Sequence, residues 1–135
     1  MKIVLDTNVL VSGLLSPFGP PARVLALIIS GELVVCYDER IIAEYRAVLA
    51  RDKFAFEKSS VDNLIRYLGN SGLSVHSVPL EHRLPDRDDE PFLEVAIASV
   101  ADALITGNIV HYPVRSRKGV KIVNPRTFLD SVYGA

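Results

Sequence analysis

The sequence predicts an α/β protein in which helices cover both faces of a central, mainly parallel sheet of four to five strands. Short apolar runs alternate along the chain with segments of helical spacing, and this alternation is typical of parallel strands joined by helical crossovers. The composition agrees, because 49% of the residues are hydrophobic and the mean hydropathy is +0.25. Such an apolar chain suits a sheet that is buried on both faces.

Apolar periodicity and turn residues set the bounds of the elements in the first half of the chain. The chain opens with the apolar run Lys2-Ile3-Val4-Leu5, and Pro and Gly residues over 16–21 separate two segments of helical spacing. Gly31 ends the second helix, and Gly69 and Gly72 mark the stop before a later strand. The predicted elements are strand 2–6, helix 8–15, helix 22–30, strand 33–37, helix 39–51, helix 59–70 and strand 73–77.

The second half begins with a polar, kinked loop over 79–88. An apolar stripe that includes Phe92, Ala96 and Val100 predicts the helix after this loop. Pro125 begins the last helix, since proline is well tolerated in the first turn. The predicted elements are helix 89–101, strand 103–106, loop 107–118, strand 120–123 and helix 125–132.

Length and charge limit the classes of function. The 135 residues are expected to form a single domain over 1–135, large enough to bury roughly two thirds of the surface that the unfolded chain exposes. The net charge of −1 and the pI near 6.3 are not those of a basic nucleic-acid-binding domain, so any such binding must be local. A basic stretch near the C-terminal end either contacts phosphate or is an ordinary solvated loop; it contains Arg115, Arg117, Lys118, Lys121 and Arg126.

No targeting or membrane segment is expected. Asp6 interrupts the first apolar run too early for a signal peptide, and no stretch approaches the roughly 18 to 20 apolar residues of a membrane span. We therefore expect a cytoplasmic protein without a membrane partner. Cys36 is the only cysteine and lies in an apolar run, which excludes a disulfide within the chain and indicates a buried thiol.

Three carboxylates fall where a parallel sheet collects ligands. Asp6 directly follows the first strand, and ligands of open sheets bind at the carboxyl ends of the strands. Glu44 lies three residues after Ile41, within the apolar face of its helix, where a glutamate is rarely buried without a partner. Asp89 extends the apolar stripe of the later helix to its start. Each carboxylate alone also fits a structural role.

The joint placement of these carboxylates predicts a cation site. Two like charges about 4 Å apart repel by roughly 4 kcal/mol at an effective dielectric constant of about 20, so three carboxylates at one sheet edge require protonation or a bound cation. Oxygen ligands without a set of His or Cys residues suit Mg²⁺ or Mn²⁺ rather than zinc. His76, His82 and His111 are too scattered for a zinc signature and are expected on the surface or in loops.

Several residues near these carboxylates could belong to the site or could instead cap a helix. Asp88 fits the capping position of the later helix better than Asp89 does, and Asp86 lies in the preceding loop. Thr7 and Asn8 are placed either to hydrogen-bond the first carboxylate or to cap the first helix.

Four segments occur in an order that is typical of one family. They are Asp6-Thr7-Asn8, Glu44-Tyr45-Arg46-Ala47-Val48-Leu49, the run from Asp86 to Ala96 and the run from Ala101 to Asn108, and the segment from Val120 to Leu129 is also in character. Together they resemble the PIN-domain family, in particular its branch of proposed toxins of toxin–antitoxin systems. The resemblance runs from Met1 to about Leu129.

The resemblance implies a metal-dependent ribonuclease on a three-layer α/β/α sandwich, in which acidic residues hold Mg²⁺ or Mn²⁺. Asp6, Glu44 and Asp89 match the acidic positions of the family, with Asp88 as the alternative to Asp89. The fourth acidic position of many relatives is Asn108 here, whose amide oxygen can bind a metal or its water but brings no charge. This difference leaves open whether one or two ions bind.

The resemblance also implies a substrate and partners. RNA is the implied substrate, and Thr7, Asn8 and Arg46 are candidates for binding it, with a solvated side chain as the alternative for Arg46. An antitoxin protein and a second copy of the chain are implied partners. The apolar Val9-Leu10-Val11 and Leu14-Leu15 segments fit a dimer interface and core packing equally well.

Two other functions fit parts of the sequence. An aspartate after the first strand also occurs in phosphotransferases that form an aspartyl-phosphate, but those of the haloacid dehalogenase type need a second aspartate two residues later, where this chain has Asn8. A PIN-like module that has lost effective metal binding through Asn108 would bind RNA or a protein without catalysis. The second of these is the stronger alternative to a nuclease.

Overall fold

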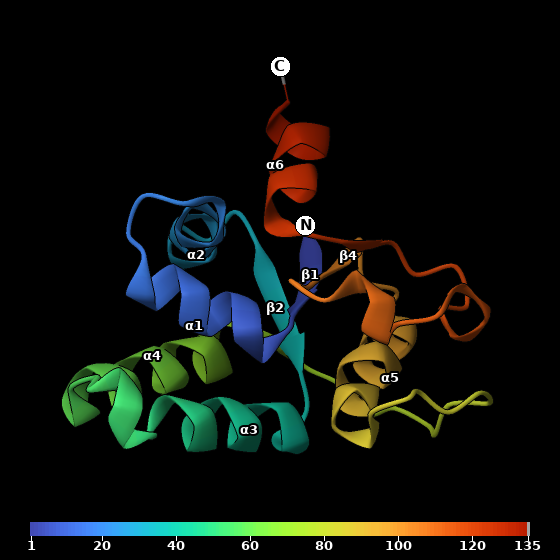
Figure 1. Ribbon diagram of the computed structural model, residues 1–135, viewed down its shortest axis with the longest axis horizontal. Helices are drawn as coiled ribbons and strands as arrows, with labels where there is room; N and C mark the ends of the chain where they lie inside the picture. Colours follow the sequence, from blue (N-terminus) through green and yellow to red (C-terminus); the bar gives the residue numbers. More distant parts are fainter. Residues whose placement is uncertain (135) are drawn as a thin grey trace.

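A parallel sheet organises the chain in the computed structural model, which describes residues 1–134 (Figure 1). The strand order is β3-β2-β1-β4-β5, so the first strand lies at the centre of the sheet. Every pairing is parallel, and Leu5 on β1 lies opposite Ile105 on β4. The strands are β1 (Lys2–Leu5), β2 (Val34–Tyr37), β3 (Leu73–Ser74), β4 (Ala103–Ile105) and β5 (Ile122–Val123).

Helices and short 3₁₀ turns connect these strands. Each predicted helix and strand is present within a few residues of its expected bounds, although β3 and β5 are shorter than predicted. The helices are α1 (Thr7–Leu15), α2 (Pro20–Ile29), α3 (Glu39–Leu49), α4 (Lys58–Ser71), α5 (Glu90–Ser99) and α6 (Pro125–Tyr133). The 3₁₀ turns are η1 (Asp52–Phe54), η2 (Arg87–Asp89), η3 (Ile109–His111) and η4 (Val114–Ser116).

The helices lie on both faces of the sheet, as the composition predicted. Figure 1 shows α5 on one side of β1 and β4, and α1 and α2 on the other side. The physical reason is the direction of the crossovers. The chain moves from β1 outward to β2 and β3, and then returns across the sheet to β4, so right-handed connections place the two sets of helices on opposite faces. The three-layer α/β/α prediction is therefore confirmed.

The core is built around the central strand. Ile3, Val4 and Leu5 of β1 are completely buried, and large side chains from α3 and α5, including Tyr45 and Phe92, pack near them. Burying β1 on both faces explains why its sequence is a continuous apolar run rather than an alternating one.

Burial tests two predictions about apolar residues, namely the buried thiol of Cys36 and the packing of the apolar segments in α1. Cys36 on β2 is fully buried, as predicted, and burial raises the pKa of its thiol. Val9 and Leu10 belong to the core, whereas Leu14 and Leu15 on the next turn of α1 are exposed. Core packing thus accounts for the first of these two segments.

Two details of the helix ends differ from the predictions. Gly69 was expected to help end α4 but lies inside it, and Gly72 alone follows the helix, with its N–H donating to the Leu68 carbonyl at 2.9 Å. Val100 was placed in the apolar stripe of α5. It instead ends the helix with a positive φ of 52° and is exposed, because the chain must turn there into β4.

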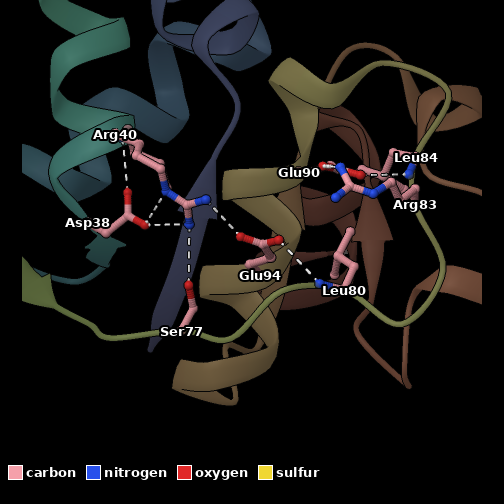
Figure 2. Close-up of polar contacts among 9 residues, drawn as sticks. Asp38, Arg40, Ser77, Leu80, Arg83, Leu84, Glu90 and Glu94 are labelled. Atoms are coloured by element: carbon pink, nitrogen blue, oxygen red, sulfur yellow. Dashed lines mark hydrogen bonds and ion pairs between the residues drawn. The ribbon is translucent and has the colours of Figure 1, made fainter.

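Two buried glutamates on α5 hold the loop before it (Figure 2). Glu94 accepts a hydrogen bond from the Leu80 N–H at 3.2 Å and pairs with Arg40 at 2.8 Å. Glu90 accepts one from the Leu84 N–H at 3.0 Å. Backbone donors of the loop are thus satisfied by α5 rather than by a strand, so this long connection stays close to the helix.

Among the described residues, no single helix has both the length and the apolar composition needed to cross a bilayer, and only α1 and α2 taken together, a pair bent by 100°, meet that test.

Candidate active site at the carboxyl edge of the sheet

The strand order creates a switch point between β1 and β4. From β1 the chain first goes to β2 on one side, and later β4 pairs on the other side, so the connections leave this point in opposite directions. Ligands of open parallel sheets bind at the carboxyl ends of the strands beside such a point. Asp6 directly follows β1 and Thr106 directly follows β4, which places both residues there.

Asp6 is held by hydroxyl groups from two other segments. Asp6 is only 5% exposed, and its backbone N–H donates to the Ile105 carbonyl at 2.9 Å. The Oδ2 atom accepts hydrogen bonds from Thr106 Oγ1 at 2.8 Å and from the Tyr112 hydroxyl at 3.0 Å. This buried carboxylate is therefore anchored through one oxygen.

Glu44 reaches the same region from α3. Its side chain is half-buried and accepts a hydrogen bond from the Thr7 hydroxyl at the start of α1. Burial raises the pKa of Glu44, the Thr7 hydrogen bond opposes this, and the charges of Asp6 and Asp88 raise it further. The ionised form of Glu44 is thus disfavoured by its surroundings.

Asp89 reaches the site from the start of α5. Burial raises its pKa to about 6, the charges of Asp6 and Asp86 add to the shift, and His111 opposes it. The Asp89 Oδ2 atom lies 3.2 Å from His111 Nδ1, but it is buried and makes no hydrogen bond of ordinary geometry. A buried carboxylate oxygen without such a bond is costly, so it is a natural position for an added ligand.

Electrostatics link the three predicted carboxylates. The charge of Asp6 raises the pKa of both Glu44 and Asp89, which come from separate helices. Asp6 therefore lies within electrostatic range of carboxylates from two other elements at this edge of the sheet.

The neighbouring acidic residues have other positions. Asp88 is exposed, and neither Asp88 nor Asp89 uses its side chain to cap α5. Asp86 is the capping side chain instead: its Oδ1 accepts from the Asp88 N–H at 2.9 Å at the start of η2. The capping role predicted for Asp88 is wrong because a 3₁₀ turn intervenes before the α-helix.

Thr7 and Asn8 contact other elements rather than the end of α1. No side chain caps this helix, so the predicted capping role is wrong for both residues. The Thr7 hydroxyl donates to Glu44, and Asn8 Oδ1 accepts from the Gly107 N–H at 3.1 Å. Each contact joins α1 to another element at the sheet edge.

Asn108 and Arg46 lie toward the edges of this region. Asn108 is exposed and lines a pocket of about 280 Å³ together with Asn8 and Ser12 of α1 and Pro125 of α6. Arg46 is exposed and lies 3.7 Å from the Asp62 carboxylate on α4. Its observed partner is thus a side chain on the helix next to α3.

Three residues at the site were missed by sequence reasoning. Thr106 and Tyr112 hydrogen-bond Asp6, and His111 approaches Asp89, although His111 was expected to be an ordinary loop histidine. Thr106 could have been found, because it is the last residue of the predicted strand 103–106. No helical or strand periodicity points to His111 or Tyr112, because both lie in the irregular segment after β4.

The donor set fits a divalent cation that keeps some of its water. Within residues 1–134, no three His, Cys, Asp or Glu side chains are close enough to form a complete metal-binding group. Mg²⁺, however, is commonly bound through only one or two carboxylates, with water filling the other positions. The Asp89 carboxylate, whose pKa is raised by the charge of Asp6, has the chemistry that such a cation needs.

The chain is a three-layer sandwich with acidic side chains at the switch point of its sheet. The comparison with family models identifies the family: the model described as PIN domain matches residues 2–110. The chain therefore belongs to the PIN-domain family, whose members are generally nucleases and typically use divalent metal ions. A comparison with curated proteins gives no match.

Proposed function

We propose that this chain is a ribonuclease that hydrolyses phosphodiester bonds with the help of Mg²⁺ or Mn²⁺. The proposal is supported by contacts around the end of β1: Thr7, next to Asp6, donates to Glu44. Tyr112 donates to Asp6, and the residue before it, His111, lies 3.2 Å from Asp89. The charge of Asp6 raises the pKa of Glu44 and Asp89, and a nearby cation would favour the ionised form of both groups.

The proposed roles follow from the position of each side chain. Asp6 is the central ligand, because its charge acts on both other carboxylates. Glu44 and Asp89 complete the ligand shell directly or through water. Thr7 orients Glu44 through its hydroxyl. Asn108 orients a water molecule or a further ligand through its amide oxygen.

The reaction is in-line displacement at phosphorus. A bound divalent cation would supply Lewis acidity, which lowers the pKa of a water molecule and offsets the charge of the phosphate. The oxygen of water forms a bond to phosphorus while the bond to the leaving ribose oxygen breaks. The protein contributes by holding its carboxylates at fixed positions, so that they need not reorganise during the reaction.

The basic stretch near the C-terminal end offers a local surface for the RNA backbone. Lys118 pairs with Glu81 at 2.6 Å, and Arg117 donates from Nε to the Tyr112 carbonyl at 2.7 Å. Arg115 is exposed on η4, in the same segment that reaches the site through Tyr112. We propose Arg115 as the first phosphate contact in this stretch.

Cleavage of a labelled single-stranded RNA by the pure protein tests the proposal. The wild type is expected to cleave with Mn²⁺ and to stop when EDTA is added. Asp6→Asn should lower the rate at least about 100-fold, because it removes the charge of the central ligand. Asp130→Asn, an exposed residue on α6, is the matched control. Equal cleavage by the wild type and Asp6→Asn, or cleavage that persists in EDTA, would refute the proposal.

A binding module without catalysis is the second candidate. It is favoured by the uncharged Asn108 and by the lack of a complete three-residue metal group in residues 1–134. The same experiment separates the two functions: a module would bind the RNA in a gel-shift assay and leave it intact with either metal.

We also propose a biological context from the family resemblance. In this context the chain acts in the cytoplasm as the toxin of a toxin–antitoxin system, and an antitoxin protein restrains it by covering the carboxylate site. A homodimer is a further proposal, and the exposed Leu14 and Leu15 are candidates for its interface.

A further inference from the structure

Tyr112 is a buried residue at the carboxylate site that has no part in the proposed reaction. Its side chain is 0% exposed, and its hydroxyl donates to Asp6 Oδ2 at 3.0 Å. A tyrosine hydroxyl is protonated at neutral pH, so this group is a hydrogen-bond donor to the carboxylate.

The partner of this hydroxyl is unusual within the protein. Tyr45 and Tyr67 donate to backbone carbonyls, of Leu5 in one case and of Ile28 and Ile29 in the other. A backbone carbonyl satisfies a buried hydroxyl without involving a charged side chain. Tyr112 donates to a carboxylate instead, so its hydroxyl does more than satisfy its own hydrogen bond.

Two donors meet on the same oxygen of Asp6. Thr106 Oγ1 donates to Oδ2 at 2.8 Å, beside the Tyr112 hydroxyl. Together they use the two lone pairs of Oδ2, whereas Oδ1 accepts no hydrogen bond from residues 1–134. The carboxylate is fixed in orientation by one oxygen, and its other oxygen is left for a ligand.

The backbone around Tyr112 is itself restrained. Arg117 Nε donates to the Tyr112 carbonyl at 2.7 Å, and the Tyr112 N–H donates to the Ile109 carbonyl at 3.0 Å. The preceding residue, His111, lies 3.2 Å from the Asp89 carboxylate. One short segment after β4 thus contacts carboxylates from both β1 and the start of α5.

We propose that Tyr112 is a positioning residue: its hydroxyl, together with Thr106, fixes the Asp6 carboxylate so that Oδ1 faces the divalent cation. The inference rests on the proposed function, because it assigns Asp6 as a ligand. Partners of metal ligands typically change metal affinity by 10- to 100-fold when they are removed.

Calorimetric titration with Mn²⁺ tests this proposal. Tyr112→Phe keeps the ring and removes only the hydroxyl, and Tyr67→Phe is the matched control, since it removes a hydroxyl bonded to carbonyls at the end of α2. The Kd of Tyr112→Phe for Mn²⁺ should rise about 10-fold, and that of Tyr67→Phe less than twofold. Thermal unfolding in EDTA measures the structural effect of each variant separately.

A second readout distinguishes positioning from general damage. Excess Mn²⁺ should restore RNA cleavage by Tyr112→Phe to near the wild-type rate, because the variant retains every ligand. Thr106→Val should weaken Mn²⁺ binding in the same direction, while Thr106→Ser, which retains the hydroxyl, should bind nearly as tightly as the wild type.

The outcomes separate the two proposals. Wild-type protein that fails to bind Mn²⁺ would overturn both the proposed function and the role of Tyr112. Equal Mn²⁺ binding by the wild type and Tyr112→Phe would overturn the positioning role alone. Tyr112→Phe could instead bind Mn²⁺ weakly and also melt at a much lower temperature in EDTA than Tyr67→Phe does. This result would show that Tyr112 has a structural role, and it would also overturn the positioning role.

Discussion

At the scale of single residues, the carboxylate site carries unfavourable electrostatics. Asp89 and Glu44 both have raised pKa values, first through burial and then through nearby charges. A protein gains no stability from such an arrangement, but a cation-binding site requires it. Functional sites often retain strain of this kind, so substitutions there can stabilise the fold while removing activity.

Asp89→Asn is predicted to stabilise the metal-free protein at neutral pH. The folded-state pKa of Asp89, about 6, lies above the ordinary 3.8, so the folded protein favours the protonated form. Stability is therefore lost as the pH rises from about 4 to about 6, and the asparagine does not suffer this loss. The gain at pH 7 should be about 1 to 3 kcal/mol.

Urea denaturation in EDTA at pH 4 and at pH 7 measures this effect. The difference in unfolding free energy between Asp89→Asn and the wild type should grow with pH. The control Asp130→Asn should differ little from the wild type at either pH. A difference for Asp89→Asn that is independent of pH would contradict the assigned cause.

At the scale of elements, close backbone contacts fix the end of α4. Gly72 lies between α4 and β3, where the chain passes near β2. A Cβ atom at Gly72 would lie 2.5 Å from the Val35 carbonyl oxygen and 2.6 Å from that of Leu68. Both obstacles are backbone atoms, so the contact cannot be relieved by turning a side chain.

Gly72→Ala is therefore predicted to destabilise the protein by about 2 kcal/mol or more. Gly69→Ala is the matched control, because Gly69 lies inside α4 and its added Cβ atom would lie 4.0 Å from the Tyr37 hydroxyl oxygen, an ordinary contact. This second variant should stabilise by about 0.5 to 1 kcal/mol through helix propensity. Urea denaturation of both variants gives their free energies of unfolding. Similar effects of the two substitutions would contradict the steric explanation.

At the scale of the whole molecule, the site joins distant parts of the chain. Asp6 follows β1, Glu44 lies on α3 and Asp89 precedes α5, so a cation bound among them would bind only the folded protein. Binding of this kind stabilises the entire fold by mass action. The carboxylate repulsion described above acts in the opposite direction when the metal is absent.

Melting temperatures of the wild type and Asp6→Asn are predicted to change order on adding Mn²⁺. In EDTA, Asp6→Asn should melt a few degrees higher, because it removes a charge that raises the pKa of Glu44 and Asp89. Mn²⁺ at ten times its Kd should raise the wild-type melting temperature by about 5 °C and leave the variant nearly unchanged. Equal shifts in the two proteins would place the bound metal elsewhere.

Sequence reasoning predicted the layers of the fold because those signals are local, and it singled out the three carboxylates from signals of the same kind. The central strand is an unbroken apolar run, since it is buried on both faces, and Asp6 directly follows it. Glu44 and Asp89 were recognisable because they stand on or next to the apolar face of a helix. Signals of this kind depend on a few neighbouring residues, and the structure preserves them with small changes in bounds.

The sequence by itself determined the parallel α/β class and the position of Asp6 at a strand end, because periodicity is set by neighbouring residues. Only the tertiary structure decided the strand order and the contacts of Thr106, His111 and Tyr112. Tyr112 and Asp6 stand 106 positions apart, and they meet because β4 pairs beside β1 and the segment after it turns back over the sheet edge. Such a meeting depends on packing of the complete chain, which no local pattern records.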